Sequence, residues 1–135
     1  MRQPDAVGLW MQLADRDLQK ARRLAEPPPF PEGVCFYAQQ AAEKALKAYC
    51  CALGAERVPR THDLVELAEL VEQLGGEAPR AAPLELLSRY AVAARYEVPI
   101  PAPDDAEEAL QMAEDLCAEL LEPLTGNTSN EDAEE

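Results

Sequence analysis

The sequence is short of positive charge, with 12 Lys and Arg against 26 Asp and Glu and a formal net charge of −14. Binding nucleic acid over the whole surface needs clustered positive charge, so any nucleic-acid site must be local. No apolar run reaches the roughly 18 residues that cross a bilayer, and the N-terminus shows no secretory signal. We therefore expect a soluble, cytoplasmic protein that does not contact a membrane.

Metal-binding and nucleotide-loop motifs are also missing. The four cysteines, Cys35, Cys50, Cys51 and Cys117, have no C-x-x-C spacing, and neighbouring cysteines on a helix point their sulfur atoms apart. The single histidine, His62, has no companion ligands for zinc. No phosphate-binding glycine loop or nucleophile elbow is present. We expect reduced cysteines, no metal and no cofactor.

The sequence does contain helical periodicity. Apolar residues recur three and four positions apart in five segments, and no segment alternates as a strand would. Proline and glycine clusters separate these segments and end the helices. The predicted helices cover residues 5–25, 34–53, 63–74, 83–96 and 104–124. We predict an all-α fold, an up-and-down antiparallel helical bundle of about five helices.

The chain of 135 residues is long enough for one domain with a hydrophobic core. We assign residues 1–124 to this helical bundle. Residues 125–135 carry four acids and no apolar residue larger than alanine. A segment of this composition cannot bury enough apolar surface to fold, so we predict a disordered acidic tail.

Asp17 interrupts the apolar arc of the first predicted helix. A buried carboxylate requires a partner, and Lys44 and Arg95 are the expected cations. We predict that Asp17 is buried within ion-pair reach of one of them. The pair would either hold two helices together or form part of a polar pocket.

The second predicted helix has two faces. Its alanine-rich face allows neighbouring helices to approach closely. The opposite face is a stripe of Phe36, Gln40, Glu43 and Lys47, with Gln39 and Lys44 beside it. Two interpretations are open: a solvated face with ion pairs three and four residues apart, or a dimer seam or pocket wall that Phe36 extends.

His62 lies beside the start of the third predicted helix, where Asp63 and Glu66 form a variant of the capping box. A helix start offers free N–H groups and the positive end of the dipole, so Thr61 and His62 are candidates for binding an anion or phosphate. The alternative is an ordinary helix cap, in which His62 is structural.

Several segments together resemble one family. The run from Cys35 to Ala48, CFYAQQAAEKALKA, is followed by RTHDL at 60–64 and ARY at 94–96. With Trp10, Asp17 and Leu18, these segments resemble the HEPN domain of prokaryotes over nearly the whole chain before the tail. The resemblance implies a helical bundle, usually a homodimer, often encoded beside a minimal nucleotidyltransferase as a two-component or toxin–antitoxin pair. It also implies a nucleotide-binding or RNA-related role.

The sequence departs from relatives that cleave RNA. Many of these carry an arginine followed four to six residues later by a histidine, near the start of the last long helix. Arg95 occupies what looks like the arginine position, but residues 99–103 contain no histidine. Arg57 and His62 have the spacing in a different segment, and we treat that match as accidental. The missing imidazole would have served in acid–base chemistry or in positioning the phosphate.

We therefore expect a non-catalytic, dimeric HEPN module that binds a nucleotide, a nucleotidyltransferase partner, or both. The alternatives are a HEPN ribonuclease toxin and a structural scaffold without a ligand. We assign no catalytic residue. The candidate ligand-binding pocket consists of Asp17, Gln40, Lys44, Lys47, His62, Arg95 and Tyr96.

Overall fold

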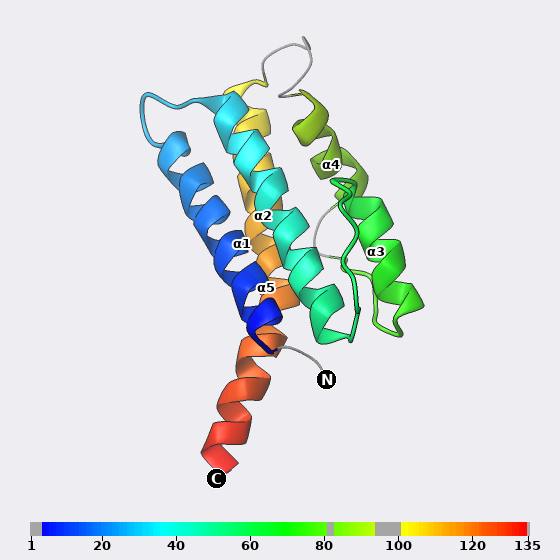
Figure 1. The fold of residues 1–135 in the computed structure, drawn as a ribbon. Coiled ribbons are helices and arrows are strands. Elements are labelled where there is room, and N and C mark those ends of the chain that lie inside the picture. Colours follow the sequence, from blue (N-terminus) through cyan, green and yellow to red (C-terminus); the bar gives the residue numbers. More distant parts are fainter. Residues whose placement is uncertain (1–3, 81–82, 94–100, 135) are drawn as a thin grey trace.

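The computed structural model describes residues 4–80, 83–93 and 101–134, and the side chains of residues 6–80, 83–90 and 101–124. Within these ranges the chain forms five helices and no strand (Figure 1), which confirms the predicted all-α fold. The helices are α1 (Pro4–Ala25), α2 (Pro31–Ala52), α3 (Leu64–Gln73), α4 (Leu84–Ala93) and α5 (Pro103–Glu134). None of these described helices is both long and apolar enough to cross a membrane.

α2 lies at the centre of the bundle and packs against each of the other four helices. α1 and α5 cover one side of α2, and the shorter α3 and α4 lie on the other (Figure 1). α1 runs antiparallel to α2, whereas α5 runs in the same direction as α2 (Figure 1). Side chains on nearly every face of α2 therefore meet protein rather than water.

The side of α2 toward α1 and α5 is lined with small residues. Alanine has no bulk beyond its Cβ, so helices that meet at alanines can pack closely. The alanines of the core cluster that have no exposed surface are Ala38, Ala41, Ala42 and Ala45 in α2, Ala14 and Ala21 in α1, and Ala109 and Ala113 in α5. The alanine face predicted from the sequence is therefore confirmed as a helix-packing surface.

The connector between α2 and α3, residues 55–62, turns back along α2 (Figure 1). The carbonyl of His62 accepts a hydrogen bond of 2.9 Å from Gln39 Nε2, so the end of the connector lies beside the middle of α2. Gln39, Glu43 and Lys47 are all buried: the end of the connector contacts Gln39 and Glu43, and Trp10 of α1 lies beside Lys47. The predicted ion pair four residues apart is present between Glu43 and Lys47. The interpretation of the stripe as solvated is wrong for these three residues, because other parts of the chain exclude the solvent.

Two helices end at glycines, as the sequence predicts. Gly54 after α2 has φ of 100°, and Gly75 after α3 has φ of 93°. This left-handed conformation directs the next amide back onto the helix: Ala55 N donates to the Cys50 carbonyl at 3.0 Å. Likewise, Gly76 N donates to the Val71 carbonyl at 2.9 Å.

The turn between α1 and α2 is tight. α1 ends at Ala25, as predicted, and α2 begins at Pro31, earlier than the predicted residue 34. Proline is tolerated in the first turn of a helix because an N–H there has no helical partner. At Gly33, an added Cβ would lie 2.8 Å from Leu24 Cδ1, so a larger residue here would require the Leu24 side chain to shift.

α5 differs from the expectation at its C-terminal end. The predicted helix ends at Leu124, whereas α5 continues to Glu134 and contains Pro123. Proline has no N–H, so the helical hydrogen-bond ladder loses one bond there. In Figure 1 the last turns of α5 extend beyond the other helices. The division into a bundle of residues 1–124 and an acidic tail of residues 125–135 stays a prediction.

Candidate functional site

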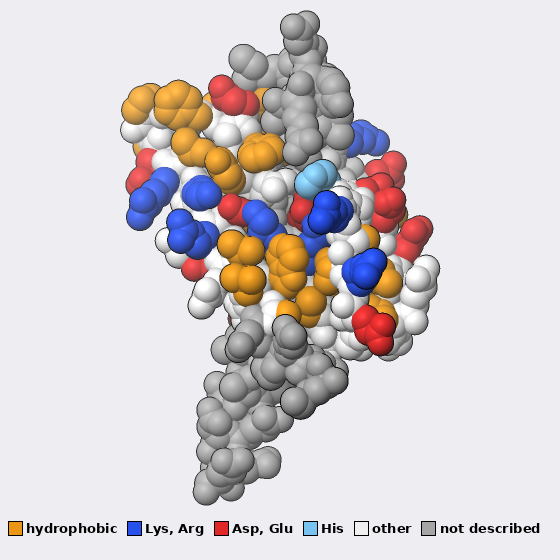
Figure 2. Space-filling model, in the orientation of Figure 1, with side chains coloured by type: hydrophobic (Ala, Val, Ile, Leu, Met, Phe, Trp, Pro, Cys, Tyr) orange, Lys and Arg blue, Asp and Glu red, His pale blue; other side chains and the backbone are white. Residues whose placement is uncertain are grey.

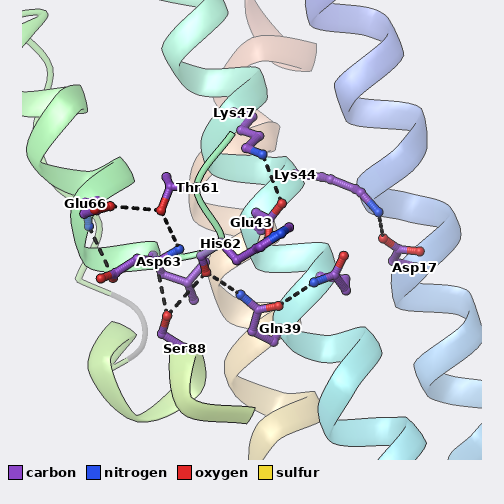
Figure 3. Close-up of polar contacts among 12 residues, drawn as sticks. Asp17, Gln39, Glu43, Lys44, Lys47, Thr61, His62, Asp63, Glu66 and Ser88 are labelled. Atoms are coloured by element: carbon purple, nitrogen blue, oxygen red, sulfur yellow. Dashed lines mark hydrogen bonds and ion pairs between the residues drawn. The ribbon is translucent and has the colours of Figure 1, made fainter. Parts of the chain in front are cut away.

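Polar side chains gather where α2 faces α1 and the connector (Figure 3). They form two groups along α2, one shared with α1 and the other with residues 61–63. Of the predicted ligand-binding residues, Asp17, Gln40, Lys44, Lys47 and His62 lie in or beside these groups. Arg95 and Tyr96 lie outside the described residues.

The first group is the ion pair between Asp17 of α1 and Lys44 of α2 (Figure 3). The Asp17 side chain is only 5% exposed, while that of Lys44 is 21% exposed. Lys20, one turn further along α1, places its Nζ 3.7 Å from the same carboxylate. The predicted burial of Asp17 and its pairing with Lys44 are confirmed. The carboxylate lies inside, and the cations that it holds lie at the surface.

The second group is centred on Glu43, whose side chain is 4% exposed. Its Oε1 lies 2.9 Å from His62 Nδ1, and its Oε2 accepts from Lys47 Nζ at 3.0 Å. A carboxylate can only accept, so Nδ1 carries the proton and the second ring nitrogen, Nε2, is an acceptor when the ring is neutral. The His62 side chain is 51% exposed. The arrangement holds an accessible imidazole against a buried carboxylate.

Lys47 is buried together with Glu43. Its side chain is 7% exposed, and its ammonium lies 5.4 Å from the centre of the Trp10 ring. A cation over an aromatic face is attracted by the ring's quadrupole. Lys47 is therefore neutralised by Glu43 and covered by Trp10. In this position it holds α1 to α2 and does not present its ammonium to solvent.

The backbone of His62 is held from two sides. Gln39, which is fully buried, donates from Nε2 to the His62 carbonyl at 2.9 Å and accepts from Gln40 Nε2 at 2.7 Å. Ser88 of α4 lies 3.4 Å from the same carbonyl through Oγ and accepts from Leu64 N at 3.1 Å. These contacts connect α2, α3 and α4 through one loop residue, so the position of the imidazole depends on all three helices.

The start of α3 is fully capped. Asp63 Oδ1 accepts from Val65 N at 2.9 Å and from Glu66 N at 3.4 Å, and Ser88 takes the amide of Leu64. Thr61 completes the cap, because its Oγ1 donates to Glu66 Oε2 at 2.9 Å and accepts from Asp63 N at 3.0 Å. The predicted cap is confirmed. Each of these amides already has a partner, which favours the alternative of an ordinary cap, and an anion site at Thr61 and His62 stays a prediction.

The four cysteines are free and buried. Burial is the main cause that raises the pKa of the Cys35 and Cys117 thiols to about 12 and that of Cys50 to about 11. Only the thiolate is a nucleophile or a metal ligand, and at these pKa values it is absent near neutral pH. The expectation of reduced thiols is confirmed. In the part of the chain that the structure describes, no three His, Cys, Asp or Glu residues group as metal ligands would.

Two residues of the site were not in the predicted pocket, Gln39 and Glu43. Both were noticed only as members of the polar stripe, because a helical pattern does not show what covers a face. One signal was present in the sequence: Gln39, Glu43 and Lys47 recur four residues apart in the helix. Side chains at this spacing lie above one another on one face of a helix.

The comparisons with known proteins give one match. The sequence profile of the HEPN domain matches residues 7–123, which is most of the chain. Searches of the curated proteins and of the solved structures returned no match. The matched range includes α1 from Val7, α2 to α4, and α5 as far as Pro123, and therefore both polar groups.

Proposed function

Because the chain belongs to the HEPN domain family, we propose that it is a non-catalytic, dimeric HEPN module that binds a nucleotide or a nucleotidyltransferase partner. The nucleotide's phosphates would lie over the two polar groups of α2. Within the predicted pocket, Lys44, His62 and Gln40 would contact the ligand. Asp17 and Lys47 would hold these residues in position without contacting the ligand, because both are buried.

The observation that carries this proposal is the order of charges from inside to outside. The carboxylates of Asp17 and Glu43 are nearly inaccessible, whereas the side chains of Lys44 and His62 reach the surface. A ligand approaching this face meets the Lys44 ammonium and the His62 imidazole before either carboxylate. Figure 2 shows Lys and Arg side chains around the histidine and over α1, on a chain with a net charge of −14. A local positive field of this kind favours phosphate.

A thermal-shift screen tests the nucleotide proposal. The wild type would be measured against common nucleoside mono-, di- and triphosphates and against inorganic phosphate. A ligand at 100 times its Kd stabilises the native state by about 2.7 kcal/mol, which is several degrees in Tm. We expect Lys44→Gln and His62→Gln to lose most of this shift and Arg80→Gln, at an exposed cation after α3, to keep it.

The result of the screen separates the proposed roles. A shift that both site variants retain would place the nucleotide elsewhere on the molecule. No shift with any nucleotide would remove the nucleotide role. In that case, co-purification of the tagged protein with a nucleotidyltransferase would support the partner role. If no nucleotidyltransferase co-purifies, a structural scaffold without a ligand is the remaining function.

A second function is favoured by the contact between Glu43 and His62. A buried carboxylate that fixes the tautomer of an accessible imidazole is the arrangement used by general bases. An RNA substrate would bring its own nucleophile, the 2′-hydroxyl, so no protein nucleophile would be needed. We expect a ribonuclease to cleave a labelled RNA, to arrest growth when expressed, and to lose both effects in His62→Ala. Intact RNA and normal growth with the wild type would reject this function.

A further inference from the structure

An aromatic ring and an amide precede Lys44 on the same side of α2. Phe36 and Gln40 lie eight and four residues before Lys44, so the three side chains follow one side of the helix. All three residues are half-buried, so each keeps some surface open to solvent. The rise from Phe36 to Lys44 is about 12 Å along the helix axis. This side of α2 therefore presents an aromatic ring, an amide and a cation, in that order.

A chain of hydrogen bonds that begins at the backbone fixes the orientation of the Gln40 amide (Figure 3). The His62 carbonyl can only accept, so Gln39 directs its Nε2 toward this carbonyl at 2.9 Å. The Oε1 of Gln39 consequently faces Gln40 and accepts from Gln40 Nε2 at 2.7 Å. Exchanging the oxygen and nitrogen of Gln40 would place two amide oxygens against each other, so Gln40 keeps its Nε2 on Gln39.

The Oε1 of Gln40 is an acceptor that the described residues leave open. None of them donates to it, and no buried side-chain oxygen or nitrogen among them lacks a partner, so this oxygen is accessible to solvent. The Nε2 of Gln40 carries a second hydrogen besides the one given to Gln39. An amide oxygen beside an N–H is the pair of groups with which glutamine binds the N6 amino group and N7 of adenine.

The ring of Phe36 is supported by its neighbour, Tyr37. The two ring centroids lie 5.2 Å apart with an interplanar angle of 79°, which is an edge-to-face contact. Lys20 of α1 lies over the Tyr37 ring, with its Nζ 5.1 Å from the ring centre. Tyr37 is thereby held between α1 and Phe36. A supported ring with exposed surface loses little conformational freedom when a base stacks on it.

We propose that Phe36 and Gln40 form the base subsite of the nucleotide site and that this subsite selects adenine. The inference rests on the proposed function, because it takes the phosphates to lie at Lys44 and His62. The base stacks on Phe36, its amino group donates to Gln40 Oε1, and its N7 accepts from the second N–H of Gln40. Guanine has the O6 oxygen where adenine has its amino group, so guanine would place an oxygen against Oε1.

Isothermal titration calorimetry on the full chain tests the base subsite. The ligands are adenosine triphosphate, guanosine triphosphate and inorganic tripolyphosphate, which has the phosphates without a base. The wild type would be compared with Phe36→Leu, Gln40→Met and Lys44→Gln. The matched controls are Phe30→Leu, at a phenylalanine that is 55% exposed, and Gln111→Met, at an exposed glutamine of α5. Circular dichroism would show that each variant is folded.

We expect the wild type to bind adenosine triphosphate about tenfold more tightly than guanosine triphosphate. Phe36→Leu should weaken both nucleotides about tenfold, as the loss of one stacked base would, and leave tripolyphosphate unchanged. Gln40→Met should remove the preference for adenine. Lys44→Gln should weaken all three ligands, and the two control variants should match the wild type.

Equal affinity of the wild type for the two nucleotides would overturn the selection of adenine, and unchanged nucleotide affinity in Phe36→Leu would overturn the stacking.

An equal loss of tripolyphosphate binding in Phe36→Leu would also overturn the base subsite, because the ring would then support the phosphate site and not the base. In each of these cases, binding that Lys44→Gln loses would leave the proposed function standing. No binding of any of the three ligands by the wild type would overturn the nucleotide site itself, and the base subsite with it.

Discussion

Two sides of α2 consist of different types of residue. Toward α1 and α5 the helix presents alanines that have no exposed surface. On another side it presents Gln39 and Glu43 to the connector and Lys47 to Trp10, and these three side chains are also buried but polar. The apolar side gains stability from area removed from water and from close packing. The polar side depends on each group finding its partner, so a single loss there leaves a buried group unsatisfied.

This difference indicates that the polar side of α2 determines which side chains can pair with the helix. Apolar cores tolerate exchanges of similar volume, whereas a buried network fixes particular partners. Among the described residues, no buried side-chain nitrogen or oxygen lacks a hydrogen-bond partner. The polar side is therefore complete, and it fixes the connector that carries His62. We expect the two sides to respond differently to substitution.

The largest effect is expected from Glu43→Leu on the polar side. The variant leaves the ammonium of Lys47 buried without its carboxylate, and breaking a buried pair in this way costs about 3–5 kcal/mol. Urea denaturation followed by circular dichroism would measure the loss. The double variant Glu43→Leu, Lys47→Met should recover most of it, because no charge then stays buried. An equal loss in both variants would show that the pair is not the cause.

A loss of similar or slightly smaller size is expected from Leu116→Ala on the apolar side. Leu116 of α5 is fully buried, and leucine-to-alanine changes in cores cost about 2–5 kcal/mol through lost contacts and the cavity left behind. Leu9→Ala, at a position 56% exposed, is the matched control and should change stability by less than about 0.5 kcal/mol. Equal losses at both positions would contradict the assignment of the core.

A smaller effect is expected from Ala41→Leu at the alanine surface. Ala41 is fully buried in α2, and its carbonyl lies 3.9 Å from Cys117 Sγ of α5. Extra methyl groups in a packed core cost about 1–3 kcal/mol. Ala118→Leu, at an exposed position of α5, adds the same volume and should be nearly neutral. A stable Ala41→Leu variant would mean that α2 and α5 do not pack closely.

The smallest effect near neutral pH is expected from the buried thiols. Burial raises their pKa from 9.0 to about 12 for Cys35 and Cys117 and to about 11 for Cys50. The unfolded state therefore loses these protons first as pH rises, so the stabilisation is complete below about pH 9 and is lost between pH 9 and 12. Urea midpoints should fall over this range. Cys117→Ala should reduce the fall, and a midpoint independent of pH would contradict the burial of these thiols.

The apolar side could be predicted from the sequence because the spacing of alanines indicates which face of a helix packs against its neighbours. The helix stops at Gly54 and Gly75 and the cap at Asp63 are local signals, and the structure confirms them. The pairing of Asp17 with Lys44 followed from one carboxylate in an apolar arc. The polar side could not be predicted in the same way, because its burial depends on the path of residues 55–62. Nothing in the local pattern of that segment specifies that it turns back along α2.

The most direct test of the nucleotide site is a nuclear magnetic resonance titration of the ¹⁵N-labelled protein with the nucleotide that gives the largest thermal shift. We predict that amide resonances of Gln40, Lys44 and His62 move together and saturate, while those of Ala109 and Ala113 on the apolar side of the bundle stay in place. Saturating shifts confined to another surface, or no shifts at millimolar nucleotide, would contradict the account.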